Sequence, residues 1–272
     1  GFTCIKTSPN GSLQRRLARL CFEEFGDAFH VFVLGQIYFP VHMALKLKIK
    51  LIFYGENGEL EYAGDHASKD SSFNDLIENE KWLNGYLKGT SLNDLIEYGL
   101  KNKDYFNKNE VSHADIKFYK PPSKNEIIEN DISKVYYYNY FKNWNPQENF
   151  YYASENTGFT PNPERTEGTY SKYASLDDKM DGMHYYMRYI KFGLGRCVED
   201  ASHEIREGHI TREEGLSLIK KYEGEFPERY FQDFLNYLNI SRDHFWDVVD
   251  SWRANHLWER KGNKWQLKHQ IK

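Results

Sequence analysis

Residues 30–55 have the sequence HVFVLGQIYFPVHMALKLKIKLIFYG, in which two short apolar runs flank a helical pattern. The first run, His30 to Leu34, is rich in Val and Phe and is followed by a glycine, which is typical of a strand. Pro40 opens a helical stretch, because proline is favoured in the first turn of a helix. The second run, Lys50 to Tyr54, ends at Gly55. Strand, helix and strand in this order predict a βαβ unit and therefore a parallel sheet.

The rest of the chain divides by composition around this unit. We predict an α/β domain over residues 1–64, and a peripheral or inserted segment over residues 65–131, which are polar and rich in Asn, Lys and Asp. Residues 132–272 begin with aromatic loops and become helical. The predicted fold class is therefore α/β, a parallel sheet followed by a helical C-terminal region. Because the chain opens with Gly1 on strand-like residues, we also expect that sequence upstream of it is missing.

Capping signals predict where several helices of the chain begin. Apolar residues at helical spacing predict a helix over residues 12–25. Ser175 with Asp178, and Thr211 with the acidic residue three positions later, have the pattern of capping boxes. Pro227 is expected to start a further helix.

Composition excludes several classes of protein. The formal net charge is -4 and the pI is about 6.2, so no overall basic field recruits nucleic acid or an anionic membrane. Cys4, Cys21 and Cys197 are far apart and odd in number, which argues against a disulfide framework and fits the cytoplasm. No apolar run approaches the length of a membrane span, and no secretory signal is visible. The histidines do not have the spacing of a zinc site, so we expect no metal site built from protein side chains alone.

Three loops could carry chemistry. Residues 54–64 follow the second predicted strand and hold three carboxylates and three glycines, which suits a divalent metal or an amine; the alternative is a solvated acidic turn. Residues 156–170 are rich in hydroxyl and amide side chains and include one arginine, which suits a sugar or a phosphate; the alternative is an ordered Ω-type loop. Residues 191–196 place two glycines between two cations and could admit a polyphosphate, although such a glycine is more often a helix C-cap.

Taken together, these segments resemble the N-acetyl sugar amidotransferases, which modify pseudaminic acid and O-antigen sugars. The matching blocks lie in most parts of the chain and are the residues 8–11, 34–36, 54–59, 155–159, 162–166, 168–173, 175–179, 191–193, 195–196 and 210–215. The region between residues 65 and 131 is the least diagnostic.

The resemblance implies an ATP pyrophosphatase fold of the adenine-nucleotide alpha-hydrolase type, of which residues 1–64 would be the C-terminal half of the nucleotide-binding domain. Such enzymes carry a Ser-Gly-Gly-x-Asp-Ser loop for the pyrophosphate, and this string does not occur in the chain. The implied reaction uses ATP and Mg²⁺ to activate a sugar acetamido group, and ammonia then converts it to an acetamidino group. The implied partners are an N-acetylated sugar substrate and separate glutaminase and synthase-like subunits that supply the ammonia.

Charge and hydrogen-bonding capacity suggest roles within the matching blocks. We expect the catalytic residues, which hold Mg²⁺, position ammonia or neutralise the leaving pyrophosphate, to be Glu56, Glu59 and Lys191. We expect nucleotide and pyrophosphate contacts from Gly55, Arg165 and Arg196. We expect the sugar to be bound by Asn57, Asn156, Thr166, Tyr170 and Lys172.

Two other functions remain open. The same fold could bind a nucleotide sugar or the partner subunit without chemistry, and the missing pyrophosphate loop favours that alternative. A tRNA-modifying ATP pyrophosphatase is the other, and the acidic balance disfavours it.

Overall fold

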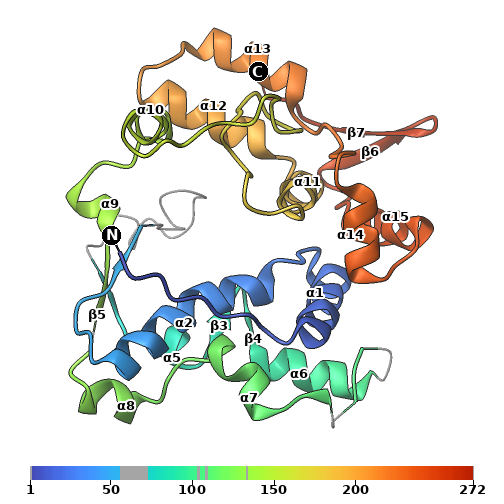
Figure 1. Ribbon diagram of the computed structural model, residues 1–272. Coiled ribbons are helices and arrows are strands. Elements are labelled where there is room, and N and C mark those ends of the chain that lie inside the picture. Colours follow the sequence, from blue (N-terminus) through green and yellow to red (C-terminus); the bar gives the residue numbers. More distant parts are fainter. Residues whose placement is uncertain (1, 56–72, 103–104, 108–109, 133, 272) are drawn as a thin grey trace. The chain divides into compact units, whose positions relative to one another are not determined.

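The computed structural model describes residues 2–55, 73–102, 105–107, 110–132 and 134–271. The chain forms two compact units, Gly1–Asn143 and Trp144–Lys272, and each is described by itself (Figure 1).

The first unit begins with helix α1 (Gly11–Phe25), as the apolar spacing predicts. The side chain of Asn10 accepts hydrogen bonds from the first backbone N–H groups of this helix, which have no partner inside it. Gly26 ends the helix in the left-handed conformation, with φ at 61°.

The βαβ prediction is wrong at its first strand. Helix α2 (His30–Leu47) covers the whole predicted strand and helix, and Pro40 lies inside it instead of opening it. Its buried residues, which set the period, are His30, Val31, Leu34, Tyr38, Val41 and Ala44. This spacing follows the turn of a helix, so burial of one face against the core overrides the strand preference of Val and Phe.

The second predicted strand is present in shortened form. Strand β1 (Phe53–Tyr54) pairs in parallel with β5 (Lys134–Tyr137), and β5 pairs antiparallel with β2 (Phe73–Asp75). The order in this small sheet is β1-β5-β2. The described residues are therefore a mostly helical α/β fold with one short parallel pair, and they do not include a full nucleotide-hydrolase sheet.

The remaining elements of the first unit pack around α1 and α2. They are α5 (Glu80–Leu83), β3 (Tyr86–Leu87), β4 (Thr90–Ser91), α6 (Leu92–Lys101), α7 (His113–Ile116), η2 (Lys117–Tyr119), α8 (Lys124–Glu129) and α9 (Tyr138–Phe141). Leu17, Leu20 and Leu34 are fully buried in one apolar core, to which the stretch predicted as peripheral adds Leu76, Leu92, Leu95, Phe106 and Ile127.

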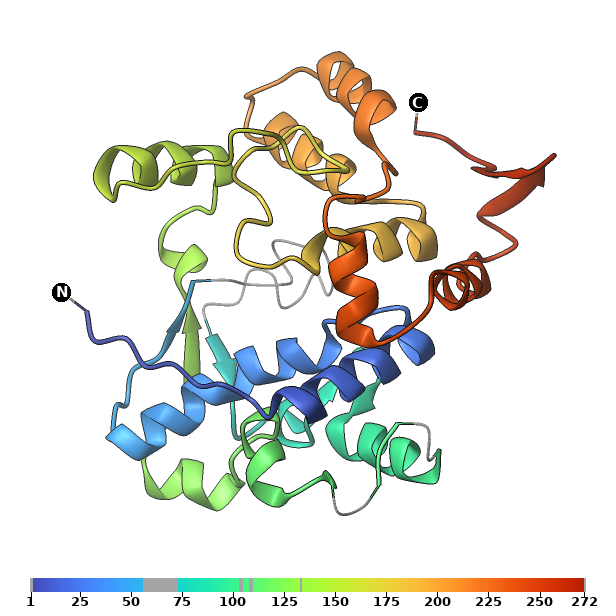
Figure 2. The same ribbon diagram turned by 45° about the vertical axis from the view of Figure 1, so that its right-hand side comes forward.

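The second unit is helical and ends in a hairpin. Its elements are α10 (Pro146–Asn156), α11 (Asp181–Phe192), α12 (Arg196–Arg206), α13 (Arg212–Tyr222), α14 (Phe231–Leu238), α15 (Arg242–Ser251), β6 (Trp258–Lys261) and β7 (Lys264–Leu267). Strands β6 and β7 pair antiparallel, and the loop between α10 and α11 runs past α12 (Figure 2).

The capping predictions have mixed outcomes. Thr211 does form a capping box with Glu214 at the start of α13. Ser175 and Asp178 do not form one, because α11 begins only at Asp181 and its N-cap residue has no side-chain hydrogen bond. The helix expected from Pro227 begins later, at Phe231.

No helix in the described part of the chain combines the length and the apolar character that crossing a membrane requires.

Candidate functional site

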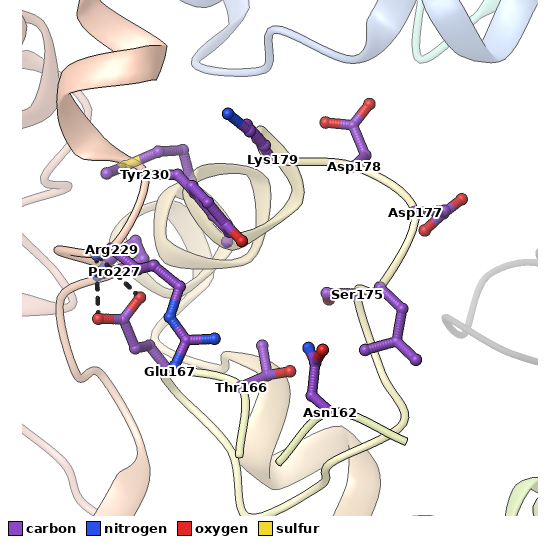
Figure 3. A pocket seen from close by; sticks show the side chains of 13 residues that line it. Asn162, Thr166, Glu167, Ser175, Asp177, Asp178, Lys179, Pro227, Arg229 and Tyr230 are labelled. Carbon is purple, nitrogen blue, oxygen red and sulfur yellow. Dashed lines mark hydrogen bonds between the residues drawn. The ribbon is translucent and has the colours of Figure 1, made fainter. Parts of the chain in front are cut away.

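A pocket of about 320 Å³ lies in the second unit, between two connecting segments and the first turn of α11 (Figure 3). One segment precedes α11, and the other, residues 223–230, joins α13 to α14. The lining residues are Asn162, Thr166, Glu167, Ser175, Leu176, Asp177, Asp178, Lys179, Gly182, Met183, Pro227, Arg229 and Tyr230.

The segment before α11 turns back on itself and so brings distant residues to one cavity. The backbone N–H of Asn162 donates to the carbonyl of Lys172 at 2.9 Å, and that of Thr166 donates to the carbonyl of Ser171 at 2.8 Å. The Thr166 hydroxyl donates to the Ala174 carbonyl at 2.7 Å. These bonds satisfy backbone groups that lie outside any helix or sheet, and they hold the segment in one conformation.

A carboxylate joins the two walls of the pocket. Both oxygens of Glu167 accept from the backbone N–H of Arg229, at 3.1 and 3.2 Å (Figure 3). The Arg229 guanidinium donates to Glu164 at 2.5 Å, so a second bond links the same two segments.

The charges of the pocket are unevenly compensated. Its two cations already have carboxylate partners, because Arg229 pairs with Glu164, and the Lys179 ammonium lies 3.1 Å from Asp233. Within the residues that the structure describes, no lysine or arginine forms an ion pair with Asp177 or Asp178.

Asp178 is half-buried and accepts the backbone N–H of Met180 at 2.5 Å. Burial, and then the carboxylates of Asp181 and Asp177, raise the pKa of this carboxyl above its ordinary value. The exposed acidic side of the pocket therefore has spare hydrogen-bond acceptors, which suit a ligand rich in donors such as hydroxyl groups.

Arg165, predicted to contact pyrophosphate, lies behind the pocket wall. Its two terminal nitrogens donate to Glu225 at 2.5 and 2.7 Å, a bidentate ion pair. The guanidinium stacks over the Tyr222 ring, 4.5 Å from its centroid. The hydrogen bond from Arg165 is the main cause that lowers the pKa of Glu225.

Arg196, the other predicted pyrophosphate ligand, is also paired. It donates to Asp200 at 3.0 Å and stacks over Tyr185, with 4.3 Å to the ring centroid. Asp200 in turn accepts the Thr169 hydroxyl at 2.5 Å, so this ion pair anchors the loop to α12.

The start of α12 is occupied by a carboxylate of the protein itself. Glu223 accepts from the backbone N–H of Gly195 and, at 3.1 Å, from that of Val198. Burial raises the pKa of Glu223, although these backbone bonds act in the opposite direction. Gly193 is the left-handed C-cap of α11, with φ at 72°, so the C-cap interpretation of this glycine pair is the one that the structure supports.

The other predicted residues of the second unit do not line the pocket. The Asn156 amide donates to the Tyr152 carbonyl at 2.9 Å, at the end of α10. The ammonium of Lys191 lies 4.9 Å from the centroid of the Trp252 ring, and Lys172 is exposed.

Tyr170 is half-buried, and burial, followed by the charge of Glu204, raises the pKa of its hydroxyl.

Of the remaining predictions, Gly55 is an exposed residue directly after β1, in the first unit. Glu56, Asn57 and Glu59 lie outside the described residues, so their roles stay predictions. Thr166 is thus the predicted site residue that lines the pocket. Across the ranges that the structure describes, no three His, Cys, Asp or Glu side chains are grouped to hold a metal ion.

Sequence reasoning assigned no site role to several lining residues, namely Asp177, Asp178, Lys179, Arg229 and Tyr230. The block 175–179 is one of the matching segments, but the sequence pattern predicts only a helix cap there, from Ser175 and Asp178. Residues 227–230 have no sequence pattern that indicates a binding site, because they reach the pocket only through the packing of α13 and α14.

A comparison with models of protein families finds one that matches much of the second unit. Residues 167–272 match the model described as LPS biosynthesis protein WbpG-like, C-terminal domain. This part of the chain is therefore similar to the C-terminal domain of WbpG-like LPS biosynthesis proteins. A comparison with curated proteins finds no match.

Proposed function

We propose that this chain acts as an ATP-dependent N-acetyl sugar amidotransferase in the synthesis of bacterial surface glycans, and that the pocket holds the sugar. The observation that carries the proposal is the position of the WbpG-like match, residues 167–272, which covers all of the pocket lining except Asn162 and Thr166. Those two residues lie in the block 162–166, which independently resembles the amidotransferases.

The dimensions and chemistry of the pocket support a sugar ligand. A volume of about 320 Å³ is at the lower end of the range for small-molecule sites, which suits a ligand of monosaccharide size. Hydroxyl groups of Thr166 and Ser175 and the carboxylates of Asp177 and Asp178 can accept or donate hydrogen bonds to sugar hydroxyls. Tyr230 adds an aromatic ring from the other wall, the segment 223–230 (Figure 3).

The proposed reaction follows from the low reactivity of an amide. ATP transfers its adenylyl group to the acetamido oxygen and releases pyrophosphate, which makes AMP the leaving group. Ammonia then adds to the same carbon, AMP departs with the oxygen, and an acetamidino group remains. The ammonia comes from a separate glutaminase with its synthase-like subunit, and Mg²⁺ accompanies the nucleotide.

Nucleotide binding rests on the resemblance and not on the cations of the second unit. Arg165 and Arg196 are engaged with Glu225 and Asp200, and Glu223 occupies backbone donors at the start of α12. These groups do not fit a free anion-binding site for a triphosphate. A nucleotide-hydrolase fold for the whole enzyme stays part of the proposal.

The test is to incubate the protein with an N-acetyl sugar, ATP and ammonium, and to analyse the sugar by mass spectrometry. We expect the small decrease in mass that accompanies replacement of oxygen by NH, together with release of AMP and pyrophosphate. Release of ADP and phosphate would contradict adenylation. A sugar that binds and is never converted would instead favour the non-catalytic alternative.

A pair of variants links the reaction to the pocket. Asp177→Ala removes an exposed carboxylate from the lining, and we expect kcat/KM for the sugar to fall by about tenfold or more, the usual effect of losing a hydrogen bond to a charged group. Asp247→Ala is the matched control, since Asp247 is an exposed residue of α15 away from the lining. Equal activities of the two variants would place the sugar elsewhere.

A further inference from the structure

The segment that joins α13 to α14, residues 223–230, is bonded to its surroundings through several of its residues. Glu223 accepts from the start of α12, Glu225 binds Arg165, and the backbone N–H of Arg229 binds Glu167. The segment is thus tied to its surroundings at several points along its length.

Arg165 makes the most connected of these ties. Besides its bidentate pair with Glu225, one terminal nitrogen donates to the carbonyls of Thr169 at 3.1 Å and Thr166 at 3.3 Å. Glu225 also accepts the backbone N–H of Gly168 at 2.9 Å. One ion pair therefore fixes the backbone on both sides of Glu167, the residue that bridges to the other wall.

These bonds leave little capacity for an external anion. Both terminal nitrogens of Arg165 point at Glu225, and the face of the guanidinium is stacked on Tyr222. A pyrophosphate would have to displace a carboxylate that already has bidentate geometry, which is the strongest form of such a pair.

We infer that Arg165 is a positioning residue for the pocket: through Glu225 it holds Thr166 and Glu167 against the segment 223–230, and so sets the distance between the two walls. The role of the pocket in binding a sugar rests on the proposed function. The clasp itself, defined as the Arg165–Glu225 pair with its bonds to the backbone of residues 166–169, does not.

The test uses Arg165→Lys, which keeps the charge and loses the bidentate geometry. We expect hydrogen exchange at the backbone amides of Gly168 and Arg229 to become faster by about tenfold, because each donates to a carboxylate whose place depends on the clasp. Affinity for N-acetylglucosamine, measured by ligand-observed NMR, should fall by a similar factor. Affinity for inorganic pyrophosphate should not change.

The matched control is Arg253→Lys. Arg253 also pairs with a carboxylate, Asp250 at 3.0 Å, and stacks over an aromatic ring, that of Trp258 at 4.5 Å, but it lies on the α15 side of the unit and does not line the pocket. It should leave exchange at Gly168 and Arg229 unchanged. Glu225→Gln, which removes the charge from the other partner, should repeat the effect of Arg165→Lys and guards against a folding defect of one variant.

The outcomes separate the two ideas. Unchanged exchange at Gly168 and Arg229 in both clasp variants would overturn the inference, whatever happens to sugar binding. Weaker pyrophosphate binding with unchanged exchange would make Arg165 an anion ligand, and overturn it too. Faster exchange in a protein whose wild type binds no sugar would support the clasp and remove the support for the proposed function.

Discussion

Different interactions stabilise the core of the first unit and the pocket walls of the second unit. In the first unit, Leu17, Leu20 and Leu34 are fully buried among other apolar side chains, on helices whose backbone groups bond one another. In the second, residues 162–175 and 223–230 lie outside regular structure, and carboxylates accept the backbone N–H groups of Gly168 and Arg229. Apolar burial needs only shape and volume, whereas each carboxylate needs a particular donor.

The difference teaches where a ligand site can form. A helix bonds its backbone groups internally and presents its side chains to the core. The first unit therefore gains its stability from the apolar surface area that it buries. Loops that line a pocket cannot bury their polar groups without partners, so they are built from ion pairs and capped amides. Stability in the core should therefore respond to volume, and order at the pocket should respond to charge and geometry.

The largest effect on stability is expected at Gly224, where the residues around the segment 223–230 leave no space for a Cβ atom. Gly224 has φ at 75°, and a Cβ there would lie 2.5 Å from ring atoms of Tyr189. Gly224→Ala should reduce the free energy of unfolding of the second unit by about 4 kcal/mol, because two costs add: that of alanine in the left-handed conformation and that of the clash with Tyr189. Gly208→Ala is the control, with φ at 76° and open space around it, and it should cost about 1 kcal/mol. Urea unfolding measures both, and equal losses would show that Tyr189 simply moves aside.

A similar but smaller loss is expected from a cavity in the first unit. Leu17→Ala should reduce the free energy of unfolding by about 3 kcal/mol, because the side chain is completely buried. Leu51→Ala, at a side chain that is 58% exposed, should stay within about 0.5 kcal/mol. Hydrogen exchange of the α1 and α2 amides, followed beside urea unfolding, would locate the loss. A small effect of Leu17→Ala would mean that the core is not the main source of stability there.

The smallest effect is expected at Asp178, and it should have opposite signs for stability and binding. The folded pKa of this group is raised by burial, so the folded state binds its proton more tightly than the unfolded state does. Its contribution to stability is therefore present below the ordinary pKa of 3.8 and is lost as the pH rises through the folded pKa. Asp178→Asn should remove the loss of stability that ionisation of Asp178 causes, so the variant should have a slightly higher melting temperature at pH 7. It should nevertheless bind an N-acetyl sugar more weakly.

Thermal unfolding between pH 3 and pH 7 checks the first part, and sugar titration checks the second. Asp247→Asn, on the exposed side of α15, is the control for the loss of one negative charge. A higher melting temperature without weaker binding would remove Asp178 from the sugar site and leave it a scaffold residue.

Sequence patterns predict the structure correctly where a few neighbouring residues determine it. The helix α1 and the capping box of Thr211 with Glu214 follow from side chains within three or four positions of each other. The strand predicted at residues 30–34 is part of helix α2 instead, because an apolar run rich in Val and Phe suits a buried helix as well as a strand. The periodic burial of α2, which separates the two, continues well beyond that run.

Residue types are enough to single out the polar loop 156–170, because hydroxyl and amide side chains that suit a sugar are visible in any conformation. The block 175–179 is marked only by its resemblance to the amidotransferases. The tertiary structure decided which of them work together. Glu225 lies 60 positions from Arg165, and Arg229 lies 62 from Glu167, so neither pair is visible in the order of residues. Packing of α11 to α14 brings these segments together, and only then do Arg165 and Glu225 neutralise each other while Asp177 and Asp178 stay available. Charge compensation depends on distance in space, and the order of residues does not specify that distance.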